Sequence, residues 1–171
     1  MGQSHYRAEL YLRTDTIGTY GPQRRTLDRI RDLAERGVFD EAELEATWEG
    51  VETVADDTRE GALDTYAEFR EWAAANDLSL EPAFDRRQRY VEGTTEIQEA
   101  VIFPTVALAL HVDDTLRAVL PCTDEFAHFT VHEALEGFER GDLDRWLARF
   151  RGIRVDRTEP YLDPSSDLQV A

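Results

Sequence analysis

The feature that most constrains the fold is the apolar stretch from Ala100 to Cys122, AVIFPTVALALHVDDTLRAVLPC. Branched and aromatic residues dominate two runs that are separated by Asp113-Asp114. Such residues favour strands, and paired aspartates favour a tight turn. Pro104 stands near the start of the first run, and proline is tolerated at a strand's first residues, at an edge or at a bulge. The segment therefore predicts a β-hairpin with its turn at Asp113-Asp114.

The rest of the chain predicts strands and helices in alternation. Residues 7–13 alternate apolar and polar side chains, as a half-buried strand does. Pro22 suits the first turn of a helix, and Gly37 suits its C-terminal cap. Thr130 and Glu133 have the spacing of a capping box at the start of a later helix. The predicted elements are strand 7–13, helix 22–37, strand 44–54, helix 57–76, the hairpin 100–122, and helices 130–141 and 142–150.

The segment at about 80–98 has no clean period, and we expect an extended or partly ordered loop there. A chain of 171 residues is long enough for one domain with a substantial core. Proline and serine follow Arg154 without apolar periodicity. We therefore expect a single domain over residues 1–151, with an irregular insertion at about 80–98, and a flexible C-terminal tail over 152–171.

The predicted order resembles that of thioredoxin-like proteins over roughly residues 7–140, and two short sequences add to the resemblance. Phe103-Pro104-Thr105 resembles their cis-proline loop, and Tyr20-Gly21-Pro22-Gln23 stands where they carry Cys-Gly-Pro-Cys. The resemblance implies an α/β fold of thioredoxin-like type, βαβ-α-ββα, with a mixed sheet and helices on both faces. It also implies a cis Phe103–Pro104 bond whose loop faces the helix start.

Both thiol positions of that motif are occupied by other residues, Tyr20 and Gln23, and Cys122 is the only cysteine. Thiol–disulfide exchange needs a thiolate and a second, resolving thiol. We therefore expect a redox-inactive protein without catalytic residues, cofactor or metal, which is not an enzyme. The resemblance implies that the peptide-binding groove and the anion-attracting helix start remain. The expected partner-binding residues are Tyr20, Gly21, Pro22, Gln23, Arg24, Arg25, Phe103, Pro104 and Thr105.

The charge balance is strongly acidic, at −17, and all 19 basic residues are arginine. This composition resembles that of cytoplasmic proteins of halophilic archaea. Near 1 M salt the Debye length falls to about 3 Å, so the net charge does not exclude a nucleic-acid partner. The longest apolar stretch is interrupted by polar residues and falls short of the ~18 residues of a membrane span. We expect a cytoplasmic protein with no membrane contact.

A second resemblance rests on three phrases, AELYLR, AEFREWAAANDLSLEPAF and VALALHVDDTLRAVLPCTD. They resemble a set of haloarchaeal proteins that are often labelled helix-turn-helix domains. The label implies a DNA-binding transcriptional regulator. However, a recognition helix follows its partner after a turn of ~3–4 residues, and the predicted strand 44–54 separates the first two helices. The favoured function is a redox-inactive protein-interaction or regulatory module with a protein or peptide partner, and nucleic acid is the alternative.

Two further clusters have a functional and a structural interpretation. Zinc-binding residue types occur together in one segment, but their spacing, Cys-x5-His-x3-His, is not that of a common zinc site. Its members are Cys122, His128, His132 and Glu133. Arg86, Arg87 and Arg89 form the densest basic patch and would suit phosphates, but a solvated loop paired with carboxylates is favoured.

Overall fold

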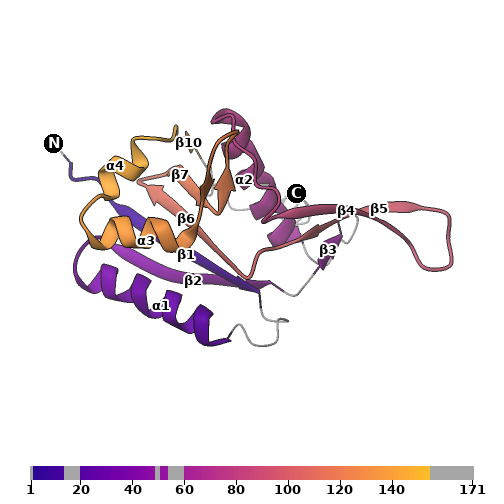
Figure 1. Ribbon diagram of the computed structural model, residues 1–171, viewed down its shortest axis with the longest axis horizontal. Coiled ribbons are helices and arrows are strands. Elements are labelled where there is room, and N and C mark those ends of the chain that lie inside the picture. The colour runs from indigo at the N-terminus through magenta and orange to yellow at the C-terminus, as the bar shows by residue number, and fades with distance from the viewer. Residues whose placement is uncertain (1, 14–19, 49–50, 54–59, 155–171) are drawn as a thin grey trace, which may run out of the picture.

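The structure is a computed structural model that describes residues 2–13, 20–48, 51–53 and 60–154 (Figure 1). Its centre is a five-stranded sheet in the order β10-β7-β6-β1-β2. β2 runs parallel to β1, and the other neighbouring strands are antiparallel. The expected mixed sheet in an α/β fold is therefore confirmed. The strands are β1 (Tyr6–Arg13), β2 (Glu41–Trp48), β6 (Val106–Val112), β7 (Thr115–Leu120) and β10 (Ile153–Arg154).

Helices cover both faces of this sheet. Those in the described residues are α1 (Tyr20–Glu35), α2 (Glu60–Ala75), α3 (Val131–Glu139) and α4 (Leu143–Leu147). α1 and α3 lie next to each other on one side (Figure 1), and the Phe39 and Phe138 rings meet there with centroids 5.8 Å apart. On β1 the Tyr11 ring packs against Phe69 of α2, at 5.5 Å. Because neighbouring residues of a strand point to opposite faces, Leu10 and its face belong to the α1 side.

A second, smaller sheet extends from the central one. It contains β3 (Val51–Thr53), β5 (Ile97–Ile102) and β4 (Asp85–Tyr90), in the order β3-β5-β4. β4 and β5 form a hairpin that reaches away from the central sheet (Figure 1). Part of the segment predicted as an irregular loop, 80–98, is therefore strand. The sequence has no apolar alternation there because β4 lies at a sheet edge and carries mostly polar side chains.

The apolar stretch that predicted one hairpin is divided between the two sheets. Its turn is as predicted, with Asp113 in the left-handed region at φ 54° between β6 and β7. Ala100, however, belongs to β5, and the chain passes into the central sheet through Phe103 and Pro104. The Phe103 ring fills the core beside Tyr66 and Phe84. The chain thus runs on from one sheet to the next at this point.

The predicted cis bond at Phe103–Pro104 is wrong. Among the described residues the cis bonds are Glu81–Pro82 and Leu120–Pro121, and the bond before Pro104 is trans. The prediction depended on a local resemblance of three residues. That resemblance did not include the passage between two sheets that the chain makes here.

Several helix ends follow their sequence signals. Gly37 has φ 80° and ends α1, with the Val38 N–H donating to the Leu33 carbonyl at 2.9 Å. Thr130 caps α3, because its hydroxyl accepts from the Glu133 N–H at 3.1 Å. Asp57, the first residue of the predicted helix 57–76, lies outside the described residues.

Towards the C-terminus, two short pairings extend the fold. β8 (Cys122–Thr123) pairs with β9 (His128–Phe129), just before α3. β10 pairs with β7, so residues 153–154 of the predicted tail join the central sheet. The rest of that tail, 155–171, lies outside the described residues. No helix in the described ranges combines the length and the apolar character that crossing a membrane requires.

Candidate functional site

Gln23 holds the start of α1 against the loop that joins β5 to β6. Its side-chain nitrogen Nε2 donates to the backbone carbonyls of Arg13 and Thr105, at 2.8 Å each. Arg13 closes the same junction, because its backbone N–H donates to the Thr105 carbonyl at 3.0 Å and its guanidinium donates to the Phe103 carbonyl at 2.7 Å. The structure therefore brings together the two segments that the thioredoxin resemblance placed side by side.

These bonds also change what the junction can do. The Thr105 carbonyl accepts two hydrogen bonds within the chain and the Phe103 carbonyl accepts one from Arg13, so the fold itself uses these acceptors. The Phe103 side chain is fully buried in the core, whereas Pro104 and Thr105 are half-buried. The expected groove along the proline loop stays a prediction.

The remaining expected residues lie along the first turn of α1. Gly21, Pro22, Arg24 and Arg25 are exposed, and the side chain of Tyr20 lies outside the described part of the structure. Gln23 is buried, because its amide points inward to the junction. The exposed residues of this turn form a polar and cationic rim above the loop.

A pocket of about 310 Å³ lies beside this turn, between α1 and β2. Gln23 and Arg24 line it together with apolar side chains of α1, β1 and β2, namely Leu27, Leu12 and Leu44. Leu44 is 42% exposed, although it is a large apolar residue. β2 is the last strand of the central sheet, and no described strand pairs with its outer edge. Exposed backbone groups beside an apolar pocket are a common setting for strand addition.

The only cysteine is not in a reactive environment. Cys122 is 1% exposed, and burial raises the pKa of its thiol to about 12, with a smaller contribution from the charge of Asp124. At neutral pH the group is therefore a thiol, and the thiolate that exchange chemistry needs is not formed.

The zinc-type residues near Cys122 are engaged elsewhere. The His132 ring contacts the Arg29 guanidinium at 2.9 Å and the Glu136 carboxylate at 3.1 Å, on the outer side of α3. His128 is exposed on β9, while Cys122 is buried. No three metal-binding side chains are grouped within the part of the chain that the structure describes.

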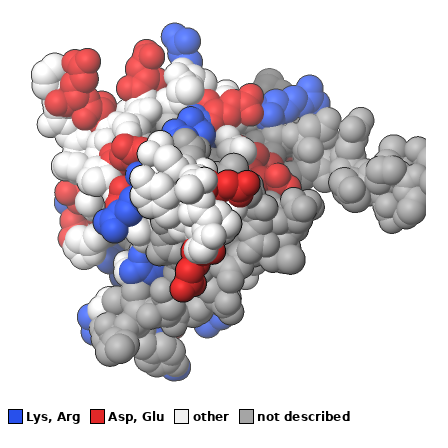
Figure 2. Space-filling model, turned by 90° about the vertical axis from the view of Figure 1, so that its right-hand side faces the viewer, with Lys and Arg blue, Asp and Glu red and all other residues white. Residues whose placement is uncertain are grey.

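The arginines of β4 do not make a uniform basic surface. The Arg87 Nε donates to the Asp85 carboxylate at 2.6 Å. Arg86 is half-buried, and the side chain of Arg89 is outside the described residues. Seen from the hairpin end, acidic and basic side chains are interspersed over this face (Figure 2). The arrangement resembles a solvated, charge-paired surface more than a track for phosphates.

Sequence reasoning missed a buried polar cluster on the α2 face of the sheet. Glu9 of β1 and His111 of β6 are both buried, and the Glu9 carboxylate also accepts from the Tyr11 hydroxyl at 2.9 Å and from Arg7 at 3.2 Å. In β1 polar and apolar side chains alternate, and this pattern predicted that the face with Glu9 is exposed to solvent. The only sequence signal for burial was that Tyr11 stands within it.

The fold and the junction thus define a mixed α/β domain in which a helix start is fixed against an interstrand loop. A family model described as a helix-turn-helix domain matches residues 2–143, and the chain belongs to this family. Neither a curated protein nor a solved structure matches. The matched residues include α1, α2 and α3, and among the described residues strands lie between each consecutive pair of these helices.

Proposed function

We propose that the chain is a redox-inactive, thioredoxin-like module of a halophilic cytoplasm that regulates a protein partner by binding it. The strand order β7-β6-β1-β2 supports the thioredoxin-like assignment, because it joins a parallel βαβ unit to an antiparallel hairpin. The covering helices, with α1 and α3 on one face and α2 on the other, support it as well. The β4–β5 hairpin is then an insertion between α2 and β6, and β3, which lies between β2 and α2 in the chain, pairs with it.

Two observations support a module without redox chemistry. Gln23, at the second thiol position of the motif, uses its amide to tie α1 to the Thr105 carbonyl. The same amide also donates to the Arg13 carbonyl, and a cysteine side chain could not donate both of these strong hydrogen bonds. Cys122 has a raised pKa and is buried, so it cannot replace the missing pair. The first turn of α1 therefore has a structural role here.

The observation that carries the binding proposal is the leucine-lined pocket beside the outer edge of β2, with which no described strand pairs. We expect an extended segment of the partner to pair with the outer edge of β2. One of its apolar side chains would enter the pocket, in contact with Leu27 and Leu44. Arg24, Asp28 and Arg31 line the same pocket, and their net positive charge would favour an acidic residue next to that side chain.

The test uses substitutions that leave the core intact. Leu44→Arg places a charge at the exposed wall of the pocket, and Ile97→Arg makes the same change at an exposed position of the other sheet. Partners are captured by crosslinking and affinity purification in molar KCl. A partner that wild type and Ile97→Arg retain, and that Leu44→Arg loses, supports the proposal. Equal capture by both variants contradicts it.

A DNA-binding regulator is the second candidate, and the family match favours it. α1 carries the exposed arginines Arg24, Arg25, Arg31 and Arg36, whose guanidinium groups could contact phosphates. If α1 binds DNA, replacing Arg24 and Arg25 by alanine should weaken a mobility shift for all sequences. It should also reduce the slope of log affinity against log salt by about two. A shift that these variants leave unchanged would exclude α1 as the contact.

A further inference from the structure

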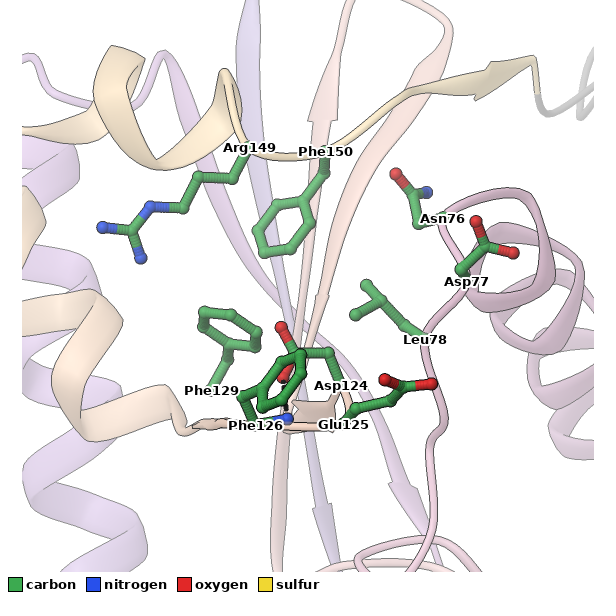
Figure 3. Close-up of a pocket in the computed structure, with 9 residues that line it drawn as sticks. All are labelled: Asn76, Asp77, Leu78, Asp124, Glu125, Phe126, Phe129, Arg149 and Phe150. Carbon is green, nitrogen blue, oxygen red and sulfur yellow. Dashed lines mark hydrogen bonds between the residues drawn. The ribbon is translucent and has the colours of Figure 1, made fainter.

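A second cavity lies away from the α1–β2 pocket and is built by different elements. It has a volume of about 600 Å³ and is bounded by the end of α2, the β8–β9 turn and the segment that follows α4 (Figure 3). Its volume is within the range of small-molecule sites, ~300–1,000 Å³. Cavities of this size usually combine an apolar wall with a few polar groups, and this one has both.

Three phenylalanine rings supply the aromatic part of the wall. Phe129 and Phe150 stand nearly perpendicular, at 86°, with centroids 5.7 Å apart, and they form one corner of the cavity. Phe126 stands at the rim and is 92% exposed. Leu78 faces them from the other side (Figure 3). A phenylalanine this exposed contributes nothing to the core, and its ring is open to a ligand at the rim of the cavity.

The turn that carries Phe126 is rigid. Asp124 Oδ1 accepts from the backbone N–H groups of Phe126 and Ala127, at 2.7 and 2.6 Å. The Asp124 N–H in turn donates to the Ala127 carbonyl at 3.0 Å. The opposite wall is also fixed, because the Asn76 amide donates to the Arg151 carbonyl at 3.0 Å. The cavity is therefore preformed.

The charged groups of the cavity are predominantly carboxylates. Asp77 and Glu125 line it, and neither forms an ion pair within the described residues. Arg149 is the cation of the lining, but its guanidinium lies 5.0 Å from the Trp146 ring centroid and points away from Leu78 and Phe126 (Figure 3). The field inside the cavity is thus negative, and an anionic ligand would be repelled.

We propose that this cavity binds an organic cation of the alkylammonium class. Aromatic rings attract weakly hydrated cations through their quadrupole, and quaternary ammonium groups are the cations best recognised by clusters of rings. Asp77 and Glu125 would supply the opposite charge, and binding an organic cation does not require a metal ion to lose its water. For K⁺ and Na⁺ the free energy of dehydration exceeds the free energy gained from contact with the rings. The site would therefore select an organic cation even in concentrated salt.

Asp77 provides a substitution that separates binding from stability. It follows α2 in the left-handed region, at φ 54°, and the Leu78 N–H donates to the Ala73 carbonyl at 2.9 Å around it. Asparagine and glycine adopt this conformation at least as readily as aspartate. Asp77→Asn therefore keeps the helix end and removes the charge. Phe126→Ala removes an exposed ring, and Tyr90→Ala does the same on the distant hairpin as a control.

The experiment is a calorimetric titration of the full chain in molar KCl, with choline and its uncharged isostere 3,3-dimethylbutanol as probes. We expect choline to bind at least about tenfold more tightly than the isostere. Phe126→Ala should lose about tenfold, Asp77→Asn several-fold, and Tyr90→Ala nothing, with unchanged melting temperatures. A peptide with trimethyllysine distinguishes two sources of the ligand. If the peptide binds more tightly than choline, the natural ligand is a side chain of a partner protein, and if it does not, the ligand is a free metabolite.

Either of two results would overturn the proposal. One is equal affinity for choline and its isostere, since the cavity would then be merely apolar. The other is the absence of binding for both choline and the trimethyllysine peptide in wild type. Failure here leaves the partner surface at β2 untouched, because Leu44→Arg and Phe126→Ala change different cavities.

Discussion

The Glu9 carboxylate and the His111 imidazole lie 2.5 Å apart, Oε1 to Nε2, and their side chains are 0% and 2% exposed. They come from the neighbouring strands β1 and β6 of the central sheet. α2 covers the face on which Glu9 lies, because the Tyr11 ring on that face packs against Phe69 of α2. Burying charged or polar groups is costly unless they are paired. The pair therefore fixes how the two strands and α2 fit together, while each partner alone would destabilise the fold.

The first prediction concerns that pair. Glu9→Ala removes the acceptor of the Tyr11 hydroxyl and leaves the buried His111 ring without the carboxylate beside it, and it should lower the free energy of unfolding by about 3–5 kcal/mol. Replacing Glu9 and His111 together by leucine should cost less than the two single changes added. Guanidinium unfolding of the double-mutant cycle measures the coupling. Additive losses would show that the contact contributes no pairing energy.

The second prediction concerns the junction at α1. Gln23→Ala removes the donor that serves two carbonyls and should destabilise the protein by about 1–3 kcal/mol. Gln23→Glu should cost more, because a carboxylate cannot donate to the Arg13 and Thr105 carbonyls. Arg25→Ala, at an exposed position of the same turn, is the control and should be nearly neutral. Equal stability of all the variants in denaturant would mean that the junction is not held by Gln23.

Much of the local structure could be predicted from the sequence, because its signals are local. The caps at Gly37 and Thr130 and the turn at Asp113 each depend on the chemistry of one or a few neighbouring residues. The order of strands and helices follows from hydrophobic periodicity in the same way. Which strands pair is decided by contacts far apart in the chain, and the split of residues 100–112 between two sheets has no local signal.

The same limit explains what was missed at the candidate sites. The side chain of Glu9 alternates with Leu10 as a solvent-facing residue would, and only the packing of α2 over that face buries it. The cavity around Phe126 joins three segments that are distant in sequence. The juxtaposition of Gln23 with Thr105 was expected from a family resemblance, but the hydrogen-bonded carbonyls and the trans bond at Pro104 were not.

The third prediction concerns pH. The folded chain holds the Cys122 pKa at about 12, above the ordinary value of 9.0. Between these values the unfolded chain releases a proton that the folded chain keeps, so stability is complete below about pH 9 and falls as pH rises. The Cys122 contribution to the slope is about 1.4 kcal/mol per pH unit. Cys122→Ala should remove that part of the slope, and an unchanged slope would contradict the prediction.

The fourth prediction concerns thiol reactivity. Cys122 is buried, so a thiol reagent at neutral pH should label the native protein only at the rate of transient opening. Labelling should become fast and stoichiometric in guanidinium. Insulin reduction should be absent in wild type and in Cys122→Ser alike. Reductase activity that survives the substitution would refute the redox-inactive assignment.

The fifth prediction concerns salt. The 36 carboxylates outnumber the 19 arginines, so like-charge repulsion should destabilise the compact state at low ionic strength. Raising KCl from about 0.1 M to about 3 M shortens the Debye length to a few ångströms, and the melting temperature should rise throughout. Glu41 and Glu43 are exposed on the edge strand β2, two residues apart. Replacing both with glutamine should raise the melting temperature most at low salt and flatten the series. A wild-type melting temperature that stays constant or falls with added KCl would contradict the halophilic assignment. If the double variant gains the same melting temperature at every salt concentration, the two glutamates act through packing and not through charge.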